Sequence, residues 1–266
     1  MKAIALAAAV SVMMSGCTAQ DTPGAPDAPA ETAIGDKPKL GLMTTLPILW
    51  SGHGEFGEML SGEEEPHWAR GVLSEMHDLQ ALDVLTPAAL DEIALLVLAQ
   101  PRMLSGEENV ALDEWVRGGG HVLVFADPML TEHSDFGIGD KRRPQDVALL
   151  DPILARWGMT LDAGPPKLET TFAPLGAAQV PLRAEGFLEF RDPAGGAETR
   201  CAHVVGRILA RCDIGSGSAV VLADAAVLEA HPWAEEGIDE PSEAALRELL
   251  GIAGERTRSR PGKTGE

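Results

Sequence analysis

Short apolar runs alternate with segments of helical periodicity along most of the chain. Residues 93–99 and 121–126 form two such runs, each too short for a buried helix and typical of a parallel strand covered on both faces. Between them, Ser105 and Glu108 have the spacing of a capping box, and three glycines at 118–120 end the helical pattern. Strand, helix and strand at these lengths predict a crossover unit of a parallel sheet.

The remaining pattern extends this unit in both directions. It predicts further strands at 39–46, 77–82 and 219–223 and further helices at 66–76, 86–92 and 242–252. A helix interrupted at Asp151-Pro152 is expected within 144–158, and irregular β structure within 161–195. We therefore expect one α/β domain over residues 38–253, with an open, mostly parallel sheet, helices on both faces and an added β-hairpin region. Residues 254–266 are expected to form a disordered polar tail.

The first residues have the order of a secretory signal. Lys2 precedes an uncharged, alanine-rich stretch that ends at Ser15-Gly16-Cys17. Because the apolar run is only about half of the roughly 20 residues that span a bilayer, a transmembrane helix is the weaker interpretation. Small residues before a cysteine resemble the bacterial lipobox, so we expect a signal peptide at 1–16 and lipid on Cys17. Ordinary cleavage near Ala19-Gln20, which would release a soluble protein, is the alternative.

Residues 17–37 are rich in Pro, Ala, Asp and Thr, and such a composition cannot bury enough apolar surface to fold. They are expected to form a tether between the lipid and the domain. Thr18 follows the cysteine where an Asp would favour retention at the inner membrane in many Gram-negative bacteria. The expected location is therefore the periplasmic face of the outer membrane.

Charge and aromatic content exclude some partners. The formal net charge of −20 disfavours nucleic acid, whose phosphates such a surface would repel. Aromatic residues make up 4% of the chain and tyrosine is absent from it, which gives little support to a carbohydrate-binding module of the envelope.

Two cysteines remain once Cys17 is assigned to lipid. Cys201 and Cys212 flank Val205-Gly206-Arg207, and the alternating pattern around this turn would let them face each other across a β-hairpin. An exported protein lies where disulfides persist, so a bond between them is expected. Two buried free thiols are the alternative.

The central part of the chain resembles a known family. Its motifs lie between residues 95 and 158: Leu95-Leu96-Val97-Leu98, Ser105-Gly106-Glu107-Glu108, Leu112-Asp113-Glu114-Trp115-Val116 and Gly118-Gly119-Gly120-His121, continuing to Asp127-Pro128. They resemble the GldG-like auxiliary domain of uncharacterised ABC-type transport systems. The resemblance implies a fold similar to class I glutamine amidotransferases and flavodoxins, and ABC permease or ATPase subunits as partners.

The amidotransferase reaction itself is not expected. It needs a cysteine on the elbow after a central strand, with a histidine to activate it. Gln100-Pro101-Arg102 follow the strand at 93–99 and contain neither residue. The chain also lacks a Gly-x-Ser-x-Gly elbow, a phosphate loop and a dinucleotide fingerprint, so no cofactor is expected.

Open α/β sheets bind ligands at the carboxyl ends of their strands. The side chains expected there are those of His53, Glu55, Asp127 and His133, with Glu132 and Asp135 beside them. Histidines and carboxylates brought together could hold a divalent metal. The alternative is that Asp127-Pro128 is a turn at the sheet edge and both histidines lie at the surface, and no metal site is assigned.

Two functions from different classes remain. The first is a non-catalytic envelope lipoprotein that serves as an accessory or scaffold subunit of a membrane complex. It rests on the predicted anchor, the tether and the expected fold without a nucleophile. The second is a metal-dependent periplasmic hydrolase, which requires His53, Glu55, Asp127 and His133 to converge on one ion.

Overall fold

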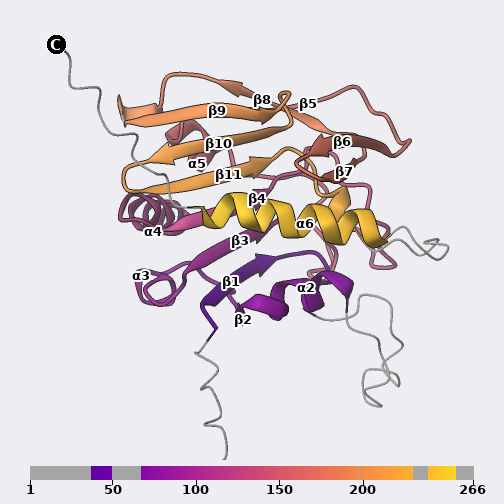
Figure 1. Ribbon diagram of the computed structural model, residues 1–266, viewed down its shortest axis with the longest axis horizontal. Coiled ribbons are helices and arrows are strands. Elements are labelled where there is room, and N and C mark those ends of the chain that lie inside the picture. The colour runs from indigo at the N-terminus through magenta and orange to yellow at the C-terminus, as the bar shows by residue number, and fades with distance from the viewer. Residues whose placement is uncertain (1–36, 50–66, 197, 230–238, 256–266) are drawn as a thin grey trace, which may run out of the picture. The chain divides into compact units, whose positions relative to one another are not determined.

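A seven-stranded sheet organises the chain in the computed structural model (Figure 1), which describes residues 37–49, 67–196, 198–229 and 239–255. The strands follow one another across the sheet in the order β2 (Asp78–Ala81), β1 (Lys39–Thr44), β3 (Leu95–Ala99), β4 (His121–Phe125), β11 (Gly217–Leu222), β10 (Leu209–Ile214) and β9 (Thr199–Val205). The first five are parallel, whereas β10 and β9 are antiparallel to their neighbours. The mostly parallel sheet expected from the sequence is confirmed.

The parallel part has the strand order of flavodoxin-like folds. The chain passes from β1 outward to β2 and then returns to the other side of β1 to form β3, β4 and later β11. Such an order places a switch point between β1 and β3, where loops from the two strands diverge. The carboxyl edge near this point is therefore the first place to look for a site.

Helices cover both faces of the sheet. The face turned toward the viewer in Figure 1 carries α2 (Trp68–Met76), α6 (Asp239–Gly254) and the hairpin of β6 (Thr171–Leu175) and β7 (Ala178–Leu182). The far face carries α3 (Pro87–Leu90), α4 (Gly106–Arg117), α5 (Asp151–Arg156) and the pair β5 (Met159–Ala163) and β8 (Gly186–Phe190). In β3, Leu95 and Val97 pack into the first layer, and Leu96 and Leu98 into the second. Apolar residues at every position of this strand follow from burial on both sides.

The helical expectation for 144–158 is only partly confirmed. The helix α5 begins at Asp151, which lies in its first turn and gives no side-chain cap. The preceding residues are not helical because their backbone groups bond to the sheet edge: the carbonyl of Gln145 accepts from the Gln100 side chain, and the Ala148 N–H donates to the Asp127 carbonyl. Residues 161–195 contain regular strands, β6 to β8, where irregular structure was expected.

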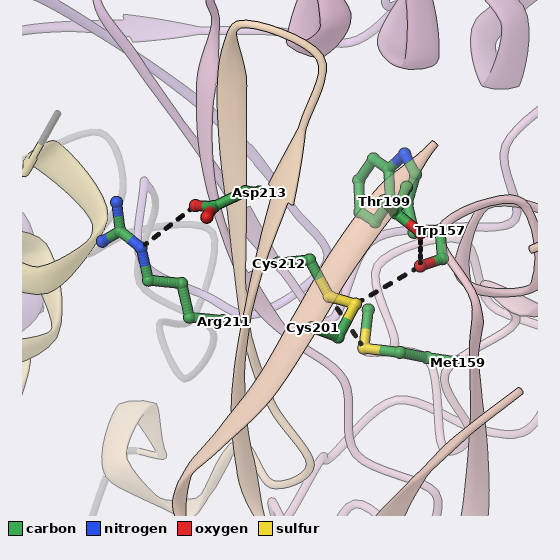
Figure 2. Close-up of a disulfide and its surroundings, with 7 residues drawn as sticks. All are labelled: Trp157, Met159, Thr199, Cys201, Arg211, Cys212 and Asp213. Atoms are coloured by element: carbon green, nitrogen blue, oxygen red, sulfur yellow. Dashed lines mark hydrogen bonds and ion pairs between the residues drawn. A yellow bond between two sulfur atoms is a disulfide. The ribbon is translucent and has the colours of Figure 1, made fainter. Parts of the chain in front are cut away.

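The disulfide between Cys201 and Cys212 is present (Figure 2). The two cysteines are directly opposite in the antiparallel β9–β10 pair, as the sequence pattern predicts. Cys212 is fully buried beside Met159, while Arg211 and Asp213 point to the other side of β10. The bond therefore joins the last two strands of the sheet on the face that packs against Trp157 and Met159.

Reduction of this bond should destabilise the domain. A closed loop of this length contributes about 3 kcal/mol in the chain-entropy model. We expect urea unfolding of the wild type in reductant to resemble that of the double variant Cys201→Ala/Cys212→Ala, whose own stability should not respond to reductant. Thiol labelling of both cysteines in the non-reduced protein would contradict the bond.

Candidate functional site at the carboxyl edge of the sheet

Polar residues occupy the first or second position after each of four adjacent parallel strands. Thr45 follows β1, Gln100 follows β3, Asp127 follows β4 and Asp224 follows β11. Because carboxyl ends of parallel strands share one edge, these residues gather at the place where open α/β sheets bind ligands. Gln100, Asp127 and Asp224 are nevertheless fully buried. The edge is thus filled by side chains and loops of the chain itself.

Gln100 occupies a strained elbow directly after β3. Its φ is +44°, which is uncommon for a residue with a side chain. The side-chain amide donates to the carbonyls of Asp127 at 3.0 Å and Gln145 at 2.9 Å, and its oxygen accepts from the Asp127 N–H at 2.9 Å. The Gln100 carbonyl accepts from the Thr45 hydroxyl at 2.6 Å. Gln100 thus joins the ends of β1, β3 and β4, the first through its carbonyl and the last through its side chain, and its amide has no nucleophilic chemistry.

Asp127 presents its carboxylate to backbone donors. One oxygen accepts from the Met129 N–H at 2.7 Å and the other from the Ala225 N–H at 3.2 Å. Burial raises the pKa of Asp127 to about 7, with a smaller contribution from the charge of Glu229, although the two N–H donors oppose the shift. This carboxyl group therefore changes charge near neutral pH.

Two further buried carboxyl groups lie beside Asp127. Asp224 accepts from the N–H groups of Ala226 at 2.6 Å and Arg183 at 2.8 Å, and burial followed by the charge of Asp127 raises its pKa well above the ordinary value. Glu229, only 2% exposed, accepts from the Thr131 hydroxyl at 2.6 Å and lies 3.5 Å from the Arg183 guanidinium. We call Asp127, Asp224 and Glu229 the acidic cluster, and Arg183 is a cation in contact with it.

The other residues singled out in the sequence do not join this cluster. The His133 side chain is 70% exposed and lies 3.3 Å from Asp135 at the surface. His53 and Glu55 lie outside the described residues. Within the described ranges, no group of three or more His, Cys, Asp or Glu side chains is arranged to hold a metal ion. The partners of the acidic cluster are backbone N–H groups, the Thr131 hydroxyl and the Arg183 guanidinium.

Most of the acidic cluster was not expected from the sequence. Gln100, Asp127 and Asp224 each directly follow an apolar run in the sequence. This shared pattern could have placed all three at the carboxyl edge of the sheet. Glu229 and Arg183 carry no such signal, because Glu229 follows the short helix η2 (Ala226–Leu228) and Arg183 follows β7. Their positions depend on how the loops fold over the sheet.

Structures of other proteins resemble the chain only distantly. The cytoplasmic protein STM1381 from Salmonella typhimurium LT2 is 12% identical, over 80% of this chain and 98% of its own, with a TM-score of 0.47. The exo-beta-1,4-mannosidase Op5Man5 from Opitutaceae bacterium strain TAV5 is 13% identical, over 82% of this chain and 36% of its own, with a TM-score of 0.46. Gan42B, a GH42 beta-galactosidase from G. stearothermophilus, is also 13% identical, over 82% of this chain and 30% of its own, with a TM-score of 0.46.

The chain spans about a third of the length of these two glycosidases. Structural similarity with identities and TM-scores this low does not indicate a shared activity. No curated protein matches the chain in sequence. Residues 37–165, which include β1 to β4 and both Gln100 and Asp127, match the family model of an ABC-type uncharacterized transport system, so the resemblance expected from the sequence is confirmed for this part of the chain.

Proposed function

We propose that the chain is a non-catalytic accessory or scaffold protein of a membrane transport system, held at the membrane by lipid on Cys17. The observation that carries the proposal is the family match over residues 37–165. This match supports an accessory role in transport. That the protein is non-catalytic and that lipid on Cys17 anchors it are the further parts of our proposal.

The geometry of the carboxyl edge supports a non-catalytic role. An amidotransferase would place its nucleophile at the elbow after β3, where this chain has the buried amide of Gln100. Both oxygens of Asp127 and both oxygens of Asp224 accept backbone hydrogen bonds. Groups with these partners are suited to holding loops in place, which is what a docking scaffold requires.

Purification from membranes tests the partnership. We expect the tagged protein, cross-linked in cells before solubilisation, to recover ABC permease or ATPase subunits. A tagged Cys17→Ser variant should recover them less well because it would not be held at the membrane. Repeated recovery of the protein alone from cross-linked membranes would count strongly against the proposal.

The anchor is tested by processing and partitioning. No helix among the described residues is long and apolar enough to cross a membrane. If Cys17 is acylated, the mature protein should enter the detergent phase and gain the mass of lipid, whereas Cys17→Ser should accumulate as an unprocessed precursor. Cys201→Ala, which changes a cysteine in β9, is the matched control and should be processed normally. A fully processed, soluble Cys17→Ser protein would show that the lipid assignment is wrong.

Residue 18 should decide which membrane holds the protein. We expect the wild type in outer-membrane fractions and Thr18→Asp in inner-membrane fractions. A tether of about 20 residues reaches at most about 70 Å when fully extended. At the outer membrane, the protein would therefore meet the transport subunits as part of an envelope-spanning assembly, because the tether alone would not bring it to a permease.

A further inference from the structure

A cleft of about 720 Å³ opens at the amino ends of β3 and β4, at the opposite edge of the sheet from the acidic cluster. Its walls come from three places in the chain: Asp91 after α3, Trp115 in the last turn of α4 with the glycine turn 118–120 that follows it, and Ser216 before β11. The volume falls within the range of about 300–1,000 Å³ that is usual for small-molecule sites.

The glycine turn gives the cleft a fixed aromatic wall. A Cβ atom at Gly120 would lie 2.4 to 2.6 Å from the fused-ring carbons of Trp115, so only glycine lets the backbone lie against the indole. Two hydrogen bonds from residues around the start of β11 also hold the turn. The Ser216 N–H donates to the Arg117 carbonyl at 3.0 Å and the Ser218 N–H donates to the Gly120 carbonyl at 3.1 Å. Trp115 is half-buried and borders the cleft. The wall is thus formed before any ligand arrives.

The electrostatics of the cleft favour a cation. The Asp91 side chain is exposed at its rim, and the indole of Trp115 presents the aromatic surface that attracts cations most strongly. The carboxyl end of α4 points its negative dipole end at the same place. His121 also lines the cleft, with Nδ1 2.8 Å from the Ser218 hydroxyl. The formal net charge of −20 raises the local concentration of cations around the whole chain.

We propose that this cleft binds a small organic cation, with an alkylammonium group against the Trp115 ring and its charge beside the Asp91 carboxylate. The proposal is independent of the transport role, because it uses the opposite edge of the sheet.

Calorimetric titration with choline chloride tests the site, with sodium chloride adjusted to keep the ionic strength constant. We expect saturable binding of one choline per chain. Asp91→Asn should weaken it about threefold, the effect of an exposed ion pair. Trp115→Leu should weaken it about tenfold through loss of the cation–π contact. Asp162→Asn changes an exposed aspartate on β5 and should leave binding unchanged.

Three results would overturn the proposal. The first is the absence of saturable choline binding by the wild type. The second is equal weakening by Asp91→Asn and Asp162→Asn, which would show attraction to the overall charge only. The third is saturable binding of N-acetylglucosamine with no choline binding, which would make the cleft a neutral sugar site. If Trp115→Leu fails to fold, Asp91→Asn still decides, because it changes an exposed side chain.

Discussion

The free energy of unfolding should fall as the pH rises from 5 to 8, because Asp127 and Asp224 bind protons more tightly in the folded protein than in the unfolded chain. Burial raises the pKa of Asp127 to about 7, against about 3.9 for an unfolded aspartate. Between these values only the folded state holds the proton. Its stabilising effect is complete below pH 4 and is lost as the pH passes through 7.

The size of this effect follows from the shift. Each unit of pKa difference corresponds to about 1.4 kcal/mol, so Asp127 alone accounts for up to about 4 kcal/mol. Asp224 acts with the same sign. Glu108 acts with the opposite sign, because Arg102 lowers its pKa to about 2, but its contribution is lost only below pH 4.5. Between pH 5 and 8, therefore, carboxyl groups with a raised pKa change the stability, whereas Glu108, whose pKa is lowered, does not.

Urea unfolding of Asp127→Ala at several pH values is the decisive measurement. The variant loses the hydrogen bonds to Met129 and Ala225 at every pH, so the slope of stability against pH is the informative quantity and the absolute value is not. We expect a shallower slope than in the wild type. Burial lowers the pKa of His77, which acts in the opposite direction below about pH 6.5 in both proteins and cancels in the comparison.

Asp192→Ala provides the control, since it removes an exposed aspartate after β8. It should keep the wild-type slope. Equal slopes for wild type and Asp127→Ala between pH 5 and 8 would show that Asp127 is ionised in the folded protein throughout this range.

The strands of the sheet were predictable because their burial requires apolar residues at successive positions, a pattern that is visible in a short stretch of sequence. β3 and β4 are apolar at nearly every position, since layers of helices cover both faces. The start of α4 was equally predictable, because Ser105 and Glu108 bond to each other's backbone N–H groups without help from the rest of the fold. The pairing of Cys201 with Cys212 needed only the register of a short hairpin.

The acidic cluster was not predictable in the same way. Asp127 was expected at the correct edge, either as one of several side chains that could bind a ligand or as part of a turn at the sheet edge, and its burial was not expected. Its carboxylate accepts from the Ala225 N–H, which lies 98 residues away in the chain and comes close only when the sheet has formed. The loop before α5 illustrates the same point, because its helical pattern is overridden by hydrogen bonds to Gln100 and Asp127.

Replacement of Gln100 should strongly destabilise the domain. Gln100→Ala leaves the Asp127 N–H and the Gln145 carbonyl without their side-chain partner. Each unsatisfied buried group costs about 1–3 kcal/mol, so we expect a loss of about 3–5 kcal/mol in urea unfolding.

Gln100→Gly separates hydrogen bonding from backbone strain. It removes the same side-chain bonds as Gln100→Ala, but glycine adopts the φ of +44° without the cost of about 1–2 kcal/mol that other residues incur in the left-handed region. We therefore expect Gln100→Gly to be about 1 kcal/mol more stable than Gln100→Ala, although both are weaker than the wild type. A free energy of unfolding for the glycine variant equal to or above that of the wild type would contradict this prediction. It would show that the Gln100 amide does not hold the ends of β3 and β4 together.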